Sequence, residues 1–287
     1  MSKLIMLSGL PASGKSTRAQ EIVSNGNWIR VNRDLLRKML HCGKWSGINE
    51  GITVDVEKSI AFLLLKDNKN IVVDDTNLNP KNKEMWKEVA KLSGATFEHE
   101  HIDAIIEDCI QRDGDREESV GEHVIVQMAM QYGMYPKPAK PFVLCDLDGT
   151  LCDIEHRLHF VKDVEKKDWK NFFMNIPMDK IRVDTLELLN KYSQEGHEII
   201  FVSARPDTYR YDTERWLDLH CPVAYSTVIM RRGGDSRPDT DVKKQIFDTY
   251  FKDKYPIETV IDDRPSVIRM WREQGLNVID VGKGVEF

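Results

Sequence analysis

A glycine-rich segment near the start of the chain places the tightest constraint on the fold. Residues 9–16 have the pattern G-x-x-x-x-G-K-S, they follow an apolar run at 4–7, and residues 17–23 have a helical pattern. Between a strand and a helix, such a segment forms a loop whose backbone N–H groups converge on phosphate oxygens. We therefore predict that the chain binds a nucleoside triphosphate through Lys15, with the Ser16 hydroxyl as a ligand of Mg²⁺.

Length and composition are those of a globular protein with room for two domains. Of the 287 residues, 41% are hydrophobic and 31% are charged. No apolar run is long enough to span a bilayer, and the first predicted strand starts too early to leave room for a signal peptide. The five cysteines form no C-x-x-C pair, so we expect reduced thiols in a cytoplasm.

The net charge of −6 argues against a protein that coats nucleic acid along its length. Residues 1–140 contain 19 basic and 20 acidic residues, and residues 141–287 contain 22 and 27. An acidic half can still hold a phosphate end through local arginines or a bound metal. No array of base-stacking aromatic residues is evident, so the sequence does not distinguish RNA from DNA.

Strands and helices alternate through the first half of the chain, as in a parallel α/β domain. Further strands are predicted at 28–31, 70–77 and 96–102. Helices are predicted at 35–40, 54–67, 80–92 and 106–116, and a loop at 42–51. In the helix at 54–67 we expect four apolar residues to face the core, namely Val56, Ile60, Leu63 and Leu64.

Polar residues at the ends of these elements are candidates for a site. Asp74 and Asp75 close a buried strand, a position more typical of site residues than of a turn. Arg112 and Arg116, four residues apart, could clamp an anion. His99 and His101 have no third ligand at a suitable spacing, so we predict a structural role for them.

Prolines at 136, 138 and 141 exclude a helix or a central strand and indicate a semi-rigid linker. The predicted domains are therefore residues 1–135 and 142–287, joined by 136–141. A second phosphate site follows the linker, where an apolar strand at 142–145 leads into Asp146 and Asp148. Of two such carboxylates, one can act as nucleophile and the other as proton donor, with Mg²⁺ screening their repulsion. Gly149 permits the chain to turn sharply after the strand. A calcium-binding EF-hand loop is the other reading of this motif, but the later Glu that such a loop requires is missing.

Two more buried strands of the second half end in polar residues. One, at 198–202, ends in Ser203, and another, at 259–261, ends in Asp262 and Asp263, with Lys243 and Lys244 on a helix between them. A nucleophilic Asp, a strand-end Ser, a Lys and a final acidic pair recur in this order in phosphotransferases that form an aspartyl-phosphate.

With these residues the chain resembles the bacteriophage polynucleotide kinase–phosphatases, which repair nucleic-acid ends. The resemblance covers nearly the whole chain and is carried by the motifs at 9–16, 32–37, 75–80, 146–150, 203–205 and 261–265. It implies an α/β fold with two domains: a P-loop kinase with a parallel sheet flanked by helices, followed by a Rossmann-like phosphatase domain of the haloacid-dehalogenase type.

The resemblance also implies the roles of individual kinase residues. Asp34 would be the general base on the 5′-hydroxyl group, and Arg37 would grip the 3′-phosphate of the acceptor. Asp75 and Thr76 would lie near the acceptor, and Arg116 would stabilise charge on the transferred phosphoryl group. The residues implied to bind ATP are Gly9, Gly14, Lys15, Ser16, Thr17 and Arg112.

In the phosphatase the resemblance implies that Asp146 is the nucleophile, Asp148 the general acid, and Lys243 the group that neutralises the aspartyl-phosphate. The implied substrate-binding residues are Arg157, Ser203, Arg205, Arg231 and Asp239. The implied Mg²⁺ ligands are Asp146, Asp148, Asp262 and Asp263. The alignment leaves open whether Arg231 or Arg232 is the residue that corresponds to the family's arginine in the phosphatase site.

These features favour a bifunctional enzyme that phosphorylates 5′-hydroxyl ends of RNA or DNA with ATP and removes 3′-phosphates or 2′,3′-cyclic phosphates. The resemblance implies a homo-oligomer, possibly a tetramer, that works alongside an RNA ligase in the cytoplasm, which for a phage protein is that of the host. The segment at 37–53 is shorter than in the family, which leaves the acceptor preference open. The alternatives are a metabolite kinase fused to a metabolite phosphatase, and a nucleotide-responsive binding protein without turnover.

Overall fold

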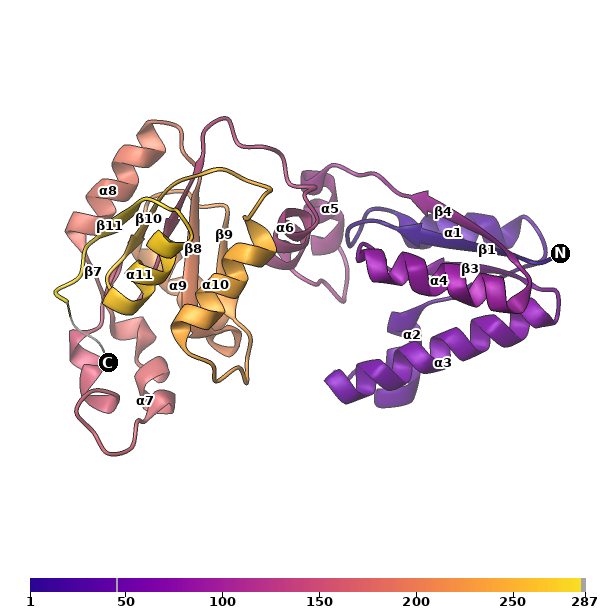
Figure 1. Cartoon of the computed structure of the whole chain (residues 1–287), viewed down its shortest axis with the longest axis horizontal. Coiled ribbons are helices and arrows are strands. Elements are labelled where there is room, and N and C mark those ends of the chain that lie inside the picture. The colour runs from indigo at the N-terminus through magenta and orange to yellow at the C-terminus, as the bar shows by residue number, and fades with distance from the viewer. Residues whose placement is uncertain (45, 285–287) are drawn as a thin grey trace. The chain divides into compact units, whose positions relative to one another are not determined.

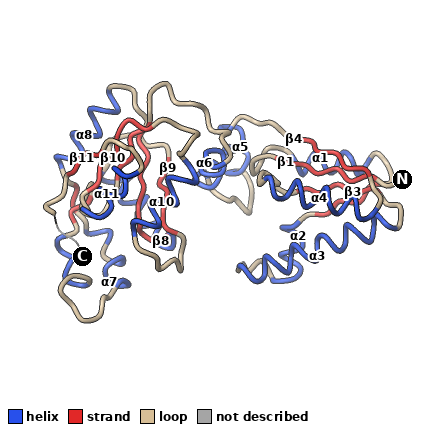
Figure 2. The backbone as a smooth tube through the Cα atoms, viewed as in Figure 1, coloured by secondary structure: helices blue, strands red, loops and turns tan. Residues whose placement is uncertain are grey.

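Two separate parallel sheets organise the chain. The computed structural model describes residues 1–44 and 46–284, and the chain divides into the units Met1–Tyr132 and Gly133–Phe287 (Figure 1). In each unit the strands form one central sheet with helices packed around it (Figure 2). The predicted α/β fold is confirmed. No helix in the described ranges is long and apolar enough to cross a membrane.

The first unit contains a four-stranded sheet with the order β2-β3-β1-β4, in which every neighbouring pair is parallel. Its strands are β1 (Lys3–Ser8), β2 (Trp28–Val31), β3 (Asn70–Asp74) and β4 (Thr96–His101). Its helices are α1 (Lys15–Ser24), α2 (Arg33–His41), α3 (Gly47–Lys66), α4 (Pro80–Ser93), α5 (Ile106–Gly114) and α6 (Glu122–Gln131). Leu7 of β1 lies opposite Asp74 of β3, so the glycine-rich loop starts beside the end of β3.

Both faces of this sheet are covered because the side chains of a strand point alternately to its two faces. Leu4 and Met6 of β1 pack into a cluster with residues of α3 and α4, including the fully buried Trp86. Ile5 and Leu7 face the other way and pack on α1. This burial on both faces is typical of central parallel strands and explains their continuous apolar runs.

Helix α3 differs from its prediction in two ways. It begins at Gly47, so the segment predicted as a loop at 42–51 is partly helical, with the Ser46 side chain accepting a hydrogen bond from Asn49 N. Residue 45, also in that segment, lies outside the described residues.

The inward face of α3 also differs from its prediction. The buried residues of α3 are Thr53, Glu57, Ala61 and Leu65. Of the expected inward residues, Val56, Ile60 and Leu64 are only half-buried, and Leu63 is 66% exposed. The apolar pattern was misleading because the inward-facing stripe includes a polar and an acidic residue.

The second unit contains a five-stranded parallel sheet with the order β11-β10-β5-β8-β9. Its strands are β5 (Phe142–Cys145), β8 (Ile199–Pro206), β9 (Thr227–Arg231), β10 (Ile257–Asp262) and β11 (Val278–Asp280), and a small antiparallel pair is formed by β6 (Cys152–Asp153) and β7 (Lys180–Ile181). Its α-helices are α7 (Trp169–Met174), α8 (Val183–Gln194), α9 (Arg210–His220), α10 (Asp239–Tyr250) and α11 (Pro265–Glu273). The short 3₁₀ helices are η1 (Glu155–Phe160), η2 (Ile176–Met178) and η3 (Asp207–Tyr209).

Strand β5 lies between β10 and β8, so its carboxyl end meets the ends of both neighbours. Cys145 pairs in register with Ile261 on one side and Phe201 on the other. The residues just beyond these three positions are Asp146, Asp262 and Val202, with Ser203 next. This is the edge at which parallel α/β sheets bind their ligands.

The stretch before β5 belongs to the second unit. The Tyr135 ring packs on Phe142 and Tyr255, with centroid distances of 6.2 and 6.3 Å. Its hydroxyl donates to Glu198 Oε2 at 2.9 Å, and its carbonyl accepts from the Tyr255 hydroxyl at 3.1 Å. The role of residues 136–141 as a linker stays a prediction. The contacts of Tyr135 fix the residue just before this segment to the second unit.

We expect Tyr135→Ala to destabilise the second unit by about 2 kcal/mol, because the ring packing and the hydrogen bond to Glu198 are both lost. Tyr135→Phe should cost about half as much, since it keeps the ring. Urea unfolding of the two variants measures both values. Equal stability of Tyr135→Ala and the natural protein would show that the contacts of Tyr135 contribute nothing.

Candidate active sites

The loop between β1 and α1 has a backbone that only glycine can adopt at one position. Gly9 has a φ of +152°, and a Cβ atom there would lie 2.7 Å from both Ile102 O and Ser13 Oγ. Lys15 folds back over the loop, and its Nζ donates to Gly9 O at 3.1 Å and to Leu10 O at 2.6 Å. Burial lowers the pKa of Lys15 to about 8. A polyphosphate would place negative charge beside this buried ammonium group.

The residues that open α1 are available to a ligand. Gly14 has a φ of +106° and precedes the helix, and Ser16 and Thr17 in the first turn are exposed. The backbone N–H groups of a first helical turn have no partners within the helix and favour anions. The strand–loop–helix prediction is therefore confirmed, and the ligand roles of these residues stay predictions.

The start of α2 is tied to the end of β3. Asn32 caps α2 by accepting from Leu35 N, and its amide group donates to Asp74 O. Arg33 N donates to Asp75 Oδ1 at 2.8 Å. These bonds place Asp34, whose side chain is 75% exposed, in the first turn of the helix.

Asp34 and Arg37, predicted to serve the acceptor together, lie in contact. Arg37 Nη1 donates to Asp34 Oδ1. The same guanidinium group is held from α3 by both carboxylate oxygens of Glu50, at 2.9 and 3.1 Å. Sequence reasoning missed Glu50, which lies in the segment predicted as a loop.

The two candidate clamp arginines do not share a helix, because α5 ends at Gly114 rather than at 116. Arg112 lies in the last turn and forms an exposed ion pair with Asp108 at 3.3 Å. Arg116 lies beyond the helix, 3.9 Å from Asp113 Oδ1. Burial lowers the pKa of Lys15, and the positive charge of Arg116 acts in the same direction. The role of Arg116 stays a prediction.

Three structural observations complete the first unit. Thr76 O accepts from Gly9 N at 3.0 Å, which links the segment after β3 to the loop. His99 and His101 both contact the buried Ser8 hydroxyl at 2.8 Å, a structural arrangement as predicted. Arg33 and Glu57 form a buried ion pair at 2.8 Å, and Asp75 Oδ2 lies 3.8 Å from the same guanidinium nitrogen.

Glu57 is a buried acid that sequence reasoning missed. Burial and the neighbouring charge of Asp75 raise the pKa of Glu57 to about 9, although Arg33 opposes this shift. Burial also raises the pKa of Asp75. The four-residue spacing of Thr53, Glu57 and Ala61 was the available signal, because it places Glu57 on the inward face.

At the edge of the second sheet, Lys243 joins two carboxylates. Its Nζ lies 2.9 Å from Asp146 Oδ1 and 2.8 Å from Asp262 Oδ2. Trp271 Nε1 also donates to Asp262 Oδ2, at 3.2 Å. Burial and the nearby carboxylates raise the pKa of Asp146, and Lys243 counteracts them. The fold brings these residues together from α10, β10 and the end of β5, and their catalytic roles stay predictions.

This edge suits a divalent cation. One carboxylate oxygen from each of Asp146, Asp262 and Asp263 lies within 4.8 Å of the others. Crowded carboxylates of this kind are the donors that hard cations prefer. Gly149, with a φ of +82°, allows the arrangement, because a Cβ atom there would lie 2.2 Å from Asp263 Oδ2. The Asp148 side chain is not part of this group.

Asp148 is instead held by two fully buried arginines. Its Oδ1 accepts from Arg157 Nη2 and from Arg205 Nε, the latter at 3.0 Å. Asp179, which sequence reasoning missed, accepts from both arginines as well, at 2.7 and 3.0 Å. Burial alone would raise the pKa of Asp148, but the two arginines hold it well below its usual range.

These contacts bear on the roles predicted for Arg157 and Arg205. Both guanidinium groups are turned toward carboxylates of the protein, and neither side chain is exposed. Arg205 lies on β8, which continues through Pro206 and not only to 202 as predicted. In this arrangement the two arginines position Asp148, and direct contact with a substrate stays a prediction.

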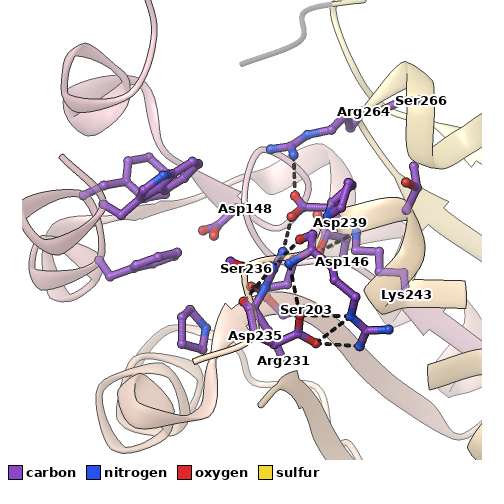
Figure 3. A pocket seen from close by; sticks show the side chains of 18 residues that line it. Asp146, Asp148, Ser203, Arg231, Asp235, Ser236, Asp239, Lys243, Arg264 and Ser266 are labelled. Carbon is purple, nitrogen blue, oxygen red and sulfur yellow. Dashed lines mark hydrogen bonds and ion pairs between the residues drawn. The ribbon is translucent and has the colours of Figure 1, made fainter. Parts of the chain in front are cut away.

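Arg231 lines a cavity of about 660 Å³ beside Asp146, and Arg232 is not among the lining residues (Figure 3). Arg231 Nε donates to Ala204 O at 2.7 Å. Asp239 at the start of α10 is bridged by Arg231 and Arg264, each of which contacts one of its carboxylate oxygens. Ser203 and Lys243 line the same cavity. The lining does not include four other predicted residues of the phosphatase site, namely Arg157, Arg205, Asp262 and Asp263.

The fold and these sites define a class: a phosphate-binding-loop unit followed by a unit of the haloacid-dehalogenase type. The family model "Polynucleotide kinase PNKP phosphatase domain" matches residues 140–286, and the model "AAA domain" matches residues 4–134. The chain belongs to the family with the polynucleotide kinase phosphatase domain, which confirms the resemblance to polynucleotide kinase–phosphatases, whereas a phage origin stays a prediction.

Named relatives agree with this assignment. The "Putative bifunctional polynucleotide kinase/RNA ligase" of Autographa californica nuclear polyhedrosis virus is 26% identical over 94% of this chain and 41% of that protein. A bifunctional polynucleotide phosphatase/kinase of Schizosaccharomyces pombe is 30% identical over 31% of this chain and 18% of that protein. The chain therefore spans less than half the length of these relatives.

Solved structures include a chain of the Pnkp1/Rnl/Hen1 RNA repair complex. It is 27% identical, the alignment covers 99% of this chain and 97% of that chain, and the TM-score is 0.43.

We expect the stability of the first unit to fall as the pH rises from about 5 to 9. An unfolded Glu57 ionises near its ordinary pKa of 4.5, whereas the folded carboxyl group keeps its proton up to about pH 9. The loss should be on the order of 2 kcal/mol and should be smaller in Glu57→Gln. Urea unfolding at pH 6 and pH 9 measures this loss in the free energy of unfolding.

Glu88→Gln, an exposed position on α4, is the matched control and should keep the pH dependence of the natural protein. A stability difference between pH 6 and pH 9 that is the same in Glu57→Gln and in the natural protein would contradict the assignment.

Proposed function

We propose that the chain is a bifunctional enzyme that repairs nucleic-acid ends. It transfers the γ-phosphate of ATP to 5′-hydroxyl ends of RNA or DNA, and it removes 3′-phosphates and 2′,3′-cyclic phosphates. The observation that carries the proposal is the presence of two sites for phosphate chemistry in one chain of this family, one around Lys15 and one around Asp146. The names of the viral and yeast relatives support the polynucleotide as substrate.

In the kinase, ATP is held by the loop from Gly9 to Ser16 and by Thr17. Asp34 is exposed and accepts the proton of the attacking 5′-hydroxyl group, and Arg37, anchored by Glu50, grips a phosphate of the acceptor. Arg112 and Arg116 add positive charge near the transferred group, and Asp75 and Thr76 lie beside the acceptor. Phosphoryl transfer relies on this combination of in-line positioning and electrostatic stabilisation.

In the phosphatase, a carboxylate oxygen of Asp146 attacks the phosphorus atom of the 3′-phosphate. The bond between phosphorus and the 3′-oxygen breaks, its electron pair stays on that oxygen, and Asp148 supplies the proton that yields the 3′-hydroxyl group. Water then attacks the phosphorus atom of the aspartyl-phosphate and gives a proton to Asp148. The bond between phosphorus and the Asp146 oxygen breaks, which releases inorganic phosphate and restores the carboxylate. Asp148 must gain a proton for this role, so its contacts with Arg157 and Arg205 have to weaken during the reaction.

Other residues support the same chemistry. Lys243 favours the ionised form of Asp146, which is the nucleophile, and Ser203, Arg231 and Asp239 border the phosphate position. We assign Asp146, Asp262 and Asp263 as ligands of Mg²⁺, with Asp148 beside them. When bound, the cation offsets the negative charge of the phosphate and of the carboxylates.

Assembly and setting form a further part of the proposal. The viral relative combines a kinase and an RNA ligase by name, which favours action alongside an RNA ligase. The five cysteines are free thiols, as suits a cytoplasm. A homo-oligomer, with a tetramer as the specific expectation, rests on the resemblance of the sequence.

We expect the two activities to be separable. Asp34→Ala should lower kinase activity by at least about a hundredfold, because the general base is lost, and should leave the phosphatase unchanged. Asp146→Ala should abolish the phosphatase, because the nucleophile is lost, and should leave the kinase unchanged. Transfer of labelled γ-phosphate to a 5′-hydroxyl oligonucleotide and release of phosphate from a 3′-phosphate oligonucleotide measure the two activities.

The same assays test the proposal against its rivals. Transfer to a free nucleoside or sugar but to no oligonucleotide would indicate a metabolite kinase. ATP binding with Mg²⁺ but no transfer to any acceptor would indicate a binding protein. Loss of both activities in one still-folded variant would contradict a model with two independent sites.

A further inference from the structure

We propose that Trp169 is a stacking platform for the nucleobase of the terminal nucleotide, so that the second unit binds the last base as well as its 3′-phosphate. The proposal rests on the proposed phosphatase function and adds a binding site to it. Trp169 opens α7, a six-residue helix between η1 and η2. The residues assigned above to phosphate chemistry do not include it.

The cavity is too large for a phosphate group alone. Its volume of about 660 Å³ lies in the range of pockets that hold ligands of several hundred daltons, which includes a nucleotide. Asp146, Ser203 and Lys243 line its phosphate end. Trp169 and Phe173 also line the cavity, and Figure 3 shows ring side chains across the open space from Asp239 and Arg264. One continuous space therefore offers a polar end for a phosphate and a flat apolar wall.

Packing fixes the orientation of the Trp169 ring. It stacks on Phe173 with a centroid distance of 5.9 Å and an interplanar angle of 20°. The buried Phe172 meets it edge-on at 5.7 Å and holds the Arg157 guanidinium group 4.2 Å from its own ring centroid. Tyr209, which precedes α9, packs against Phe173 at 5.1 Å. A rigid ring stacks a base with little loss of side-chain entropy.

Trp169 is nevertheless open to a ligand. It is 42% exposed, whereas Phe172 beneath it is 1% exposed. Lys167 Nζ lies over the Trp169 ring, 5.3 Å from its centroid, so a base that stacks on this face has to displace the flexible lysine side chain toward the phosphodiester. Every nucleobase has an aromatic face, and proteins that bind single strands combine such rings with positive charge along the backbone. The terminal base of a single-stranded end, with its phosphodiester near Lys167, fits both features.

This wall changes one expectation from the sequence, which had no evident array of base-stacking residues. Trp169, Phe172 and Phe173 are three and four positions apart, the spacing that brings side chains to one face of a helix. Tyr209 joins them only through the fold. The spacing of the three aromatic residues in α7 could therefore have predicted part of this aromatic cluster.

The test compares two oligonucleotides that carry a 3′-phosphate, one ending in adenosine and one ending in an abasic sugar. In the full chain, Trp169→Ala should raise KM for the adenosine end about tenfold, with kcat nearly unchanged, because stacking of the base is lost. Trp169→Phe should restore most of the affinity. Neither variant should change KM for the abasic end. Tyr211→Ala, which removes an aromatic ring that is 71% exposed and outside the cavity, is the matched control and should change nothing.

If Trp169→Ala changed KM equally for the adenosine end and the abasic end, the proposal would be overturned, because the ring would then only support the fold. An unchanged KM for both ends would overturn it as well. If the natural protein hydrolyses neither oligonucleotide, the proposed phosphatase function fails. In that case the Kd values of the two labelled oligonucleotides, measured by fluorescence anisotropy, decide on the platform. A preference for the adenosine end that Trp169→Ala removes would support it, and equal Kd values would overturn it.

Discussion

The ion pairs of Lys243 with Asp146 and Asp262 are the interactions on which the second site depends. Parallel strands bring their carboxyl ends to one edge, so the acids that follow β5 and β10 are forced together, and their charges repel one another. A buried ammonium group 2.9 Å from one carboxylate and 2.8 Å from the other offsets this repulsion. The remaining negative charge is what suits the edge to a divalent cation.

The same constraint recurs with arginine elsewhere in the chain. Arg157 and Arg205 hold Asp148 and Asp179, and Arg33 holds Glu57 beside Asp75. Removing one partner of such a buried pair costs far more than an exposed pair contributes, because the remaining charge stays buried and uncompensated. Both sites therefore depend on buried charges that are held by other charged residues of the chain. In the second unit these charges lie behind a cavity whose other wall is aromatic, and this combination fits a nucleotide end better than a bare phosphate.

Much of the fold could be predicted because local patterns are strong in a parallel α/β protein. The apolar runs of β1, β3 and β5 are buried on both faces. Gly9 and Asp146 follow directly after β1 and β5, and Asp262 is the last residue of β10. The failures occurred where tertiary contacts override the local pattern. Helix α3 turns Glu57 inward, where Arg33 donates a hydrogen bond to it, and α5 stops at Gly114, which separates Arg112 from Arg116.

The sequence by itself determined the loop for a polyphosphate, the paired carboxylates and their order along the chain, because each depends on residues that are neighbours in sequence. Only the tertiary structure decided which partners these residues have. It turned Arg157 and Arg205 onto Asp148 and brought Arg231 rather than Arg232 to the cavity. It also packed Tyr209 against Phe173, which lines the cavity with Trp169. The reason is physical: the direction of a side chain and the charge it meets depend on elements that are distant in sequence and close only after folding.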